Sequence, residues 1–536
     1  MSATHRPPTS NATPHFVEVV AATVERFGHR PLLSAHGSGA ALTYADVWGW
    51  AGASAQRLAG VGATPGERVV VRAPKSVEML IAYLAALRLG AVWTPVAPTA
   101  TTTELNQVID DAEPRVVIDG NRALCDMVGA APAGAPEPQP GDWPNPTPGP
   151  DQIAAMLYTS GTTGRPKGVP ITGAALSANA HALVDAWRFT EHDVLVHALP
   201  IHHAHGLFVA VGCVLASGSS MRWIDRFDAT EVIDGLRKAT MFMGVPTHFV
   251  RLLEDSGFDR ATCASVRLLI SGSAPLPAVT FQHIADRTGL EVVERYGMTE
   301  TLMLASNPID GIRKPGSVGL PLPGVEVRLG SFDDADRPGR ATEVGMVEVR
   351  GPSVFEHYWG RPPDPADRAS AADDDHAEGP AQQPWFRTGD LGRFDADGYL
   401  HLVGRSKDLI ISGGLNVYPA EVEAVLEGQP GVAEVAVIGL PDDHWGQQVT
   451  AIVVPDTGPA PSDEFCEQLV ASARERLSAY KLPRQVHLTD ALPRNLQVLV
   501  MALAYAMVAA LREVAFPAIV DLALYMKVLS SPILRI

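Results

Sequence analysis

The residues best suited to chemistry form a loop at positions 158–168, with the sequence YTSGTTGRPKG. Its glycines let backbone N–H groups converge on an anion, its four Ser and Thr hydroxyls add donors, and Lys167 adds a positive charge. An apolar run at 153–157 precedes the loop, and a helix-like segment at 173–187 follows it. This strand–loop–helix pattern predicts a polyphosphate site made by Thr159, Ser160, Gly161, Thr162, Thr163, Gly164 and Lys167.

The loop differs from the common nucleotide motif G-x-x-x-x-G-K-[ST]. Two residues separate Gly161 from Gly164, and Gly168 rather than Ser or Thr follows Lys167. The alternative interpretation is a flexible surface turn rich in Thr and Gly, which the rest of the chain disfavours.

Further polar motifs follow the loop along the chain. They are LPIHHAHG at 199–206, SGSAP at 271–275, ERYGMTE at 294–300, RTGD at 387–390, GRSKD at 404–408 and SGGLNVY at 412–418. In order and spacing, the set resembles the adenylate-forming superfamily of acyl-CoA synthetases, amino-acid adenylation domains and luciferases, over roughly residues 16–495. The runs at 199–208, 243–246, 268–276, 294–301 and 317–325 are most similar to those of malonyl-CoA synthetases.

This resemblance implies a two-step reaction with ATP, Mg²⁺ and CoA. A carboxylate attacks the α-phosphate of ATP to give an acyl-adenylate and pyrophosphate, and the thiol of CoA then displaces AMP. Malonate is the expected acid, with methylmalonate as an alternative. A general short-chain acyl-CoA ligase and a non-catalytic adenylate-binding protein remain alternative functions.

The resemblance also assigns roles to residues. Lys167, His205, Thr299 and Glu300 are expected to be catalytic, and Glu300 to hold Mg²⁺, which usually takes one or two protein carboxylates plus phosphate oxygens. Asp390 is suited to accept the ribose hydroxyls, and Arg405 to reach the sugar or phosphate. The remaining nucleotide and CoA contacts are expected from Gly272, Ser273, Ala274, Glu294, Tyr296, Gly297, Met298, Lys407, Gly413 and Gly414.

Three histidines, His202, His203 and His205, lie within four positions and invite a metal interpretation. Zinc sites need further ligands at known spacing, and none follows nearby, so we disfavour it. By resemblance, His205 lines the acyl pocket and orients the carboxylate.

Arg295 is expected to determine which carboxylic acid is the substrate. By resemblance it forms a wall of the acyl pocket, where many relatives carry a small residue. A buried guanidinium needs a partner, and a second carboxylate on the substrate supplies one. Arg251 is a second candidate clamp or else a solvated helix residue, and Ala204 and Met303 would border the α-carbon.

Strand-like and helix-like segments alternate through much of the chain, which indicates an α/β sheet. From about residue 405 the pattern changes to a small α+β unit. We predict a large multi-sheet N-terminal α/β domain at 1–404 and a small mobile C-terminal α+β domain at 405–495, with a hinge at 405–408. Gly/Pro-rich residues 129–150 and acidic residues 364–384 are predicted surface loops.

Composition narrows the class of protein. The chain has 536 residues, too many for one core, and a net charge of −18, which argues against nucleic acid as a main partner. Four separated cysteines fit a reducing compartment, and no secretory signal is visible at 1–16. We expect a cytoplasmic monomer or homodimer whose partners are a small carboxylate and CoA.

The C-terminal region departs from the superfamily pattern. After LPRN at 492–495 a Gly-Lys pair is expected, yet no lysine occurs between Lys481 and Lys527. In the superfamily this lysine donates to the carboxylate and the α-phosphate during adenylation, so its absence predicts impaired adenylation. The apolar tail at 496–536 admits three interpretations: an altered reading frame or truncated C-terminus, a packed or amphipathic helix pair, or a membrane anchor, the last disfavoured because Arg512 interrupts the apolar run.

Overall fold

The computed structural model describes residues 13–35, 41–129, 148–160, 166–331, 344–369, 384–442, 444–456 and 463–492. The predictions for Gly161, Thr162, Thr163, Gly164, the side chain of Ser160 and the tail at 496–536 fall outside this description, as do most of the two predicted surface loops.

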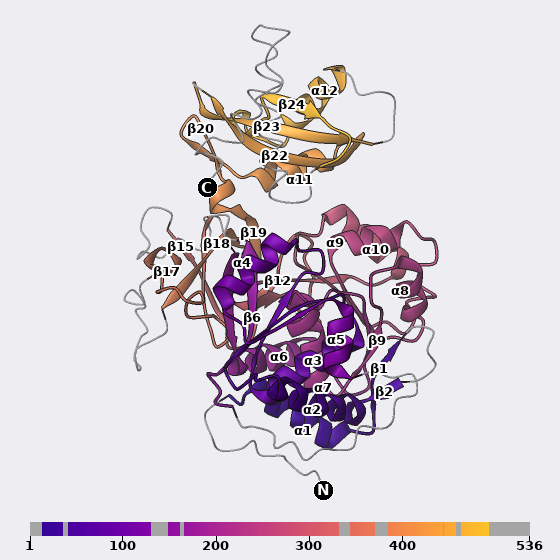
Figure 1. Ribbon diagram of the computed structural model, residues 1–536. Coiled ribbons are helices and arrows are strands. Elements are labelled where there is room, and N and C mark those ends of the chain that lie inside the picture. The colour runs from indigo at the N-terminus through magenta and orange to yellow at the C-terminus, as the bar shows by residue number, and fades with distance from the viewer. Residues whose placement is uncertain are drawn as a thin grey trace, which may run out of the picture.

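Two sheets form the larger part of the molecule (Figure 1). The first has the strand order β14-β13-β12-β11-β10-β8-β9-β1-β2 and the second the order β5-β3-β4-β6-β7. Strands of the first are β1 Pro31–Ala35, β2 Ala41–Thr43, β8 Val194–His197, β9 Ser220–Trp223, β10 Met241–Gly244, β11 Leu268–Ser271, β12 Val292–Met298, β13 Leu302–Ser306 and β14 Leu320–Pro321. Strands of the second are β3 Arg68–Arg72, β4 Val92–Val96, β5 Val116–Asp119, β6 Ile153–Ser160 and β7 Pro166–Thr172.

Parallel pairing links β9, β8, β10, β11 and β12 in the first sheet and β5, β3, β4 and β6 in the second. Helices join these strands, as parallel pairing requires. The helices of this part of the chain are α1 Phe16–Phe27, which precedes β1, and α2 Tyr44–Gly60, α3 Val77–Leu89, α4 Thr102–Ala112, α5 Asn121–Val128, α6 Gly173–Trp187, η1 His205–Val211, α7 Gly212–Ser217, α8 Ala229–Leu236, α9 Pro246–Leu253 and α10 Ala278–Thr288.

One large hydrophobic core joins the two sheets. Helix α3 is almost wholly buried in it, because its sequence VEMLIAYLAALRL is apolar on nearly every face. Ser76 caps its N-terminus and Gly90, at φ 73°, ends it in the left-handed conformation that glycine adopts without strain. The loops that carry the polar motifs are therefore anchored to a rigid body.

A third sheet continues the larger part with the order β15-β16-β18-β17, and β19 pairs with β18. Its strands are β15 Glu326–Gly330, β16 Gly345–Arg350, β17 Arg368–Ala369, β18 Trp385–Phe394 and β19 Leu400–Arg405, with the 3-10 turn η2 Pro365–Asp367 before β17. The turn η3 Ser406–Asp408 follows β19 directly.

The remaining elements form a smaller unit with its own hydrophobic core, beyond η3 (Figure 1). They are β20 Ile410–Ser412, β21 Leu415–Val417, α11 Pro419–Glu427, β22 Val432–Asp442, β23 Gly446–Pro455, α12 Asp463–Ala473, η4 Ala479–Lys481 and β24 Gln485–Leu488. The predicted fold class, a large multi-sheet α/β part followed by a small α+β part, is confirmed. No helix in the described part of the chain is long and apolar enough to span a membrane.

Candidate active site

A cavity of about 690 Å³ lies where the carboxyl ends of the central parallel strands meet the third sheet and η3. Ligands of open α/β sheets usually bind at this edge. Thirteen of the predicted residues line it: Thr159, Lys167, Ala204, His205, Ser273, Arg295, Gly297, Met298, Thr299, Glu300, Met303, Arg405 and Lys407. The structure thus brings together side chains that lie almost 250 positions apart.

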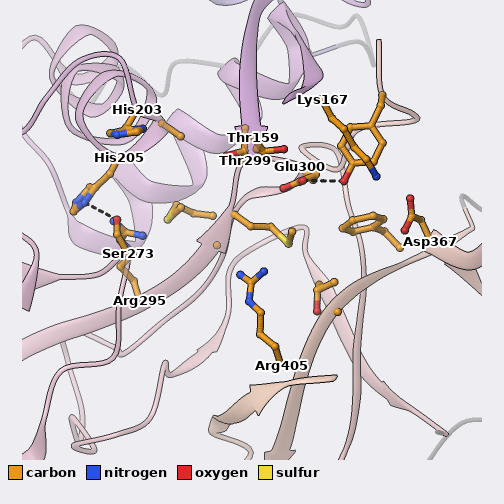
Figure 2. Close-up of a pocket in the computed structure, with 18 of the residues that line it drawn as sticks. Thr159, Lys167, His203, His205, Ser273, Arg295, Thr299, Glu300, Asp367 and Arg405 are labelled. Atoms are coloured by element: carbon orange, nitrogen blue, oxygen red, sulfur yellow. Dashed lines mark hydrogen bonds between the residues drawn. The ribbon is translucent and has the colours of Figure 1, made fainter. Parts of the chain in front are cut away.

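Arg295 is buried at one end of this cavity, on β12 (Figure 2). Its Nε and Nη2 atoms have no hydrogen-bond partner among the described residues. Burial lowers its pKa to about 9, so the guanidinium is still charged at pH 7. The guanidinium packs on Gly272, where a Cβ would lie 2.3 Å from its Cζ atom. Among the described residues, this charged group is thus held in place without an ion-pair partner.

His205 lies beside Arg295, at the start of the π-helix η1. Its Nδ1 atom is 3.3 Å from Ser273 Oγ, while its buried Nε2 has no partner among the described residues. Burial, and next the charge of Arg295, hold the pKa of His205 well below its usual range. The imidazole is therefore neutral at pH 7. Ser273 has a φ of 71°, a strained backbone of the kind found at functional sites.

The other end of the cavity contains Lys167 and Glu300 (Figure 2). The Tyr358 hydroxyl donates to Glu300 Oε1 at 3.0 Å, and Lys167 Nζ lies 4.7 Å from the centre of the Tyr358 ring. Burial raises the pKa of Glu300, while the Tyr358 hydrogen bond opposes this effect. Asp367 also lines this end. One tyrosine therefore contacts both the candidate phosphate cation and the candidate metal ligand.

Asp390 connects three elements behind the cavity. Its Oδ2 accepts from the Tyr296 hydroxyl at 2.5 Å, and its Oδ1 pairs with Arg405 Nε at 3.0 Å. Burial raises the pKa of Asp390, and Arg405 opposes the rise. Each carboxylate oxygen keeps a further lone pair, so Asp390 can still accept hydroxyl groups.

Several predicted residues do not line the cavity. Arg251 is exposed on α9, with its guanidinium 4.9 Å from the Phe227 ring centre, so the structure does not place it as a clamp. Glu294 accepts from the Gly316 N–H at 3.0 Å. Tyr296, Asp390, Gly272, Ala274, Gly413 and Gly414 are also outside the lining.

Other lining residues were missed by sequence reasoning, among them Tyr358, Asp367 and Arg387. Arg387 belongs to the RTGD motif, so that motif could have identified it. Tyr358 lies between motifs, and no pattern in the sequence marks it. Its role depends on the fold, which brings it to Lys167 and Glu300.

A magnesium ion fits one position in this cavity. No group of three His, Cys, Asp or Glu side chains in the described part of the chain could hold a metal ion. The rings of His202 and His203 lie against each other, with centres 4.2 Å apart and planes tilted by 51°. Glu300 and Asp367 are carboxylates that line the Lys167 end, and one or two protein carboxylates suit an ion that takes its other ligands from nucleotide phosphates and water.

The chain belongs to the AMP-binding enzyme family, which it matches over residues 20–359. Residues 421–496 match the C-terminal domain of the same enzymes. The resemblance to adenylate-forming enzymes is thereby confirmed.

The similar proteins include CoA ligases for more than one acid. The chain is 34% identical to the mitochondrial malonate–CoA ligase of Mus musculus, over 91% of this chain and 89% of the mouse protein. The crystal structure of ATP-bound MatB from Rhodopseudomonas palustris is 38% identical with a TM-score of 0.81, covering 91% of this chain and 99% of that one. A feruloyl-CoA synthase of Amycolatopsis is 36% identical over 85% of this chain and 92% of the relative. Relatives with different acids are thus about equally similar, and the acid must be argued from the site.

Proposed function

We propose that the chain is an ATP-dependent, AMP-forming ligase that joins malonate to CoA. Arg295 is the main support for this proposal, because its guanidinium is buried at the end of the cavity and two of its nitrogens have no hydrogen-bond partner among the described residues. A buried unpaired charge is costly, and a second carboxylate on the substrate would pair with it through a bidentate contact. Aromatic or fatty acids carry no such group. The similarity to malonate–CoA ligases supports the same acid.

The reaction would take place in two half-reactions. A malonate carboxylate oxygen attacks the α-phosphorus of ATP, an O–P bond forms, and pyrophosphate leaves with the electron pair of the broken bond. The CoA thiolate then attacks the acyl carbon, a C–S bond forms, and AMP leaves. Both steps move negative charge, so positioned cations and donors supply most of the rate enhancement.

Malonate would lie between Arg295 and His205. Arg295 would hold the distal carboxylate, and Nε2 of His205, which no described residue contacts by a hydrogen bond, would orient the reacting one. Ala204 and Met303 border the carbon between the two carboxylates, and both line the cavity. Because Ala204 is small, methylmalonate is a second substrate candidate.

The nucleotide would occupy the end with Lys167 and Glu300. Lys167 and the loop at 159–164 bind the β- and γ-phosphates, and Thr299 adds a hydroxyl. Glu300 would hold Mg²⁺, which supplies charge neutralisation on the phosphates when bound. Asp390 with Arg405 would bind the ribose, and the residues at 272–274 and 294–298 the adenine side.

The small unit would rotate on the hinge at 405–408 between the two half-reactions. Lys407 lines the cavity, whereas Gly413 and Gly414 do not. Both glycines have positive φ, at 60° and 78°, so they form a tight hairpin. After rotation, this hairpin would border the pantetheine path.

Adenylation is expected to be slow in this chain. The superfamily lysine after residue 495 has no counterpart, because the next lysine is Lys527. Loss of one preorganised donor costs roughly 10²–10³ in rate. Thioester formation from a supplied acyl-adenylate uses the other domain orientation and is expected to survive.

Pyrophosphate release tests the proposal. The purified chain is incubated with Mg-ATP and malonate, methylmalonate, propionate or ferulate, beside a second chain whose residues from 496 onward are replaced by a Gly-Lys-containing C-terminus. We expect release with the two diacids, increased by about 10²-fold in the second chain.

Release with propionate or ferulate but not with malonate would overturn the dicarboxylate assignment. Nucleotide binding without release from either chain would favour a non-catalytic adenylate-binding protein.

A further inference from the structure

A buried lysine connects the two large sheets behind the end of the cavity that contains Arg295 and His205. We call this the acyl end, and the end with Lys167 and Glu300 the nucleotide end. Lys75 lies between β3 and α3, and its side chain reaches the ends of β8 and β9. Its Nζ is 2.8 Å from His197 Nδ1, 2.8 Å from the His197 carbonyl oxygen and 2.5 Å from the Ile224 carbonyl oxygen. No described carboxylate lies within 4 Å of it. Lysine is rarely buried, so this position calls for an explanation.

The three acceptors around Lys75 match the three N–H donors of an ammonium group. The Nζ atom also lies 4.2 Å from the centre of the Trp223 ring, a favourable site for a cation. Burial lowers the pKa of Lys75, and Asp225 raises it. The direction of the hydrogen bond between Nζ and His197 Nδ1 depends on which nitrogen of His197 carries the proton.

His197 links Lys75 to a residue that lines the cavity. Its ring is stacked on Trp223, with centres 5.0 Å apart and planes at 7°. Its Nε2 lies 2.9 Å from the carbonyl oxygen of Gly206. Burial and the adjacent Lys75 hold the pKa of His197 well below its usual range, so the ring carries a single proton. A carbonyl only accepts, so that proton must be on Nε2, and Nδ1 must accept from Lys75.

Gly206 is itself a lining residue of the cavity and follows His205 in η1. A Cβ on Gly206 would lie 2.0 Å from the Pro200 carbonyl oxygen, so the turn from 200 to 206 is closely packed. The carbonyl held by His197 is therefore one peptide unit from the catalytic imidazole. Movement of this carbonyl would move His205 relative to Ser273 and Arg295.

We infer that Lys75 and His197 are positioning residues that fix the His205 turn for attack by the carboxylate. The inference rests on the proposed malonate ligation, because it assigns the two residues to that reaction. It predicts that they affect use of the acid and not binding of the nucleotide, since the Lys167 end of the cavity has no contact with this network among the described residues. Neither residue touches the reacting atoms.

The protonation of His197 can be read directly in the intact protein. Nitrogen-15 NMR of histidine-labelled protein distinguishes a protonated from an unprotonated ring nitrogen, and the His197 signals are assigned by their loss in His197→Gln. We expect a protonated Nε2 and an unprotonated Nδ1. A proton on Nδ1 alone, or on both nitrogens, would overturn the inference whatever the activity.

Kinetics then test the consequence for the reaction, in a chain carrying the Gly-Lys-containing C-terminus. Lys75→Met removes the donor at similar length, and a misplacement of about 1 Å can cost up to about 10²-fold. We expect kcat/KM for malonate to fall by about 10- to 100-fold, with KM for ATP changed less than about twofold. Lys314→Met is the matched control, because Lys314 also lies on an aromatic ring, at 4.3 Å from Tyr399, and is paired with Asp395 and Asp397 away from the cavity.

Two substitutions of His197 separate positioning from packing, even if Lys75→Met does not fold. His197→Phe keeps a ring on Trp223 but has no donor, whereas His197→Gln keeps an amide donor for the Gly206 carbonyl and an oxygen for Lys75. We expect Gln to recover most of the malonate kcat/KM that Phe loses. Equal losses in the two variants, or equal losses in ATP and malonate parameters, would overturn the positioning role. Absence of malonate turnover in the parent chain would instead refute the proposed function, and the NMR result would still stand.

Discussion

The two ends of the cavity are prepared for their ligands in opposite ways. At the acyl end, Arg295 and His205 are buried, and nitrogens of both lack partners among the described residues. At the nucleotide end, Glu300 is bonded to Tyr358, Lys167 lies on the same ring, and Asp390 is shared by Tyr296 and Arg405. The Arg295 end therefore has nitrogens without a hydrogen-bond partner among the described residues, whereas polar groups at the Lys167 end already contact other side chains.

The difference determines whether the free-energy cost of a site falls on the folded protein or on ligand binding. Unpartnered buried groups are destabilising in the folded protein, but they need no rearrangement when a matching anion arrives. Paired groups stabilise the protein before a ligand binds, and under the proposed function they would change partners when ATP and Mg²⁺ bind. We therefore expect substitutions at the acyl end to change specificity strongly, and those at the nucleotide end to change ligand affinity moderately.

Replacing Arg295 should have the largest effect on this comparison. Arg295→Ala removes the proposed partner of the distal carboxylate, and we expect kcat/KM for malonate to fall by about 10²- to 10³-fold. The KM for ATP should change little, because Arg295 lies at the other end. Pyrophosphate release across malonate and ATP concentrations measures both.

Arg251→Ala provides the comparison for Arg295, since its guanidinium is exposed on Phe227. We expect a change below about threefold, as for most surface substitutions. A loss as large as that of Arg295→Ala would restore Arg251 as a clamp and show that the acyl end closes around the substrate. Equal loss of malonate and propionate turnover in Arg295→Ala would contradict recognition of a second carboxylate.

Tyr358→Phe should have an intermediate effect at the nucleotide end. The substitution removes the hydroxyl that orients Glu300 but keeps the ring beneath Lys167. Residues that orient a metal ligand usually contribute 10- to 100-fold to metal affinity, so we expect the Mg²⁺ concentration for half-maximal activity to rise about tenfold. A Mg²⁺ titration at saturating malonate measures it. An unchanged Mg²⁺ requirement with a raised KM for malonate would show that the two ends are not separable.

The smallest effect is expected from Glu294, which precedes Arg295 but accepts from the Gly316 N–H instead of lining the cavity. Burial raises its pKa from 4.5 to about 7. The folded state therefore binds this proton more tightly than the unfolded state, so stability falls as pH rises between about 4.5 and 7 and stays lower above.

Glu294→Gln should remove this pH dependence, because an amide does not titrate and can still accept from Gly316. The difference in melting temperature between variant and parent, measured by calorimetry at pH 5 and pH 8, should favour the variant more at pH 8. The opposite ordering would mean that Glu294 has an unrecognised cationic partner, and thus that the pairing seen at the nucleotide end extends along β12.

The ordered motifs were sufficient to predict the superfamily and the fold class, and they contain twelve of the thirteen predicted residues that line the cavity, all except Met303. They succeed because each motif supplies a local shape, such as a glycine turn after a strand. Arg251 shows the limit: the sequence placed it on a helix near the site, but which face of α9 looks inward depends on how α9 packs.

The contacts that sequence reasoning missed are those made across large separations. Lys75 and His197 are 122 positions apart and meet only because the two sheets share a core. In the sequence, Lys75 is a polar residue shortly after a strand and His197 is the last residue of another, and neither position marks them as partners. Tyr358 is likewise defined by two partners, Lys167 and Glu300, from separate motifs.

The packing of the Arg295 guanidinium on Gly272 has a consequence for the residue at position 272. Even the smallest side chain there would bring a Cβ 2.3 Å from Cζ, so Gly272→Ala would displace the guanidinium from its present position. The missing side chain of Gly272 is therefore part of the space that Arg295 occupies, although Gly272 itself does not line the cavity.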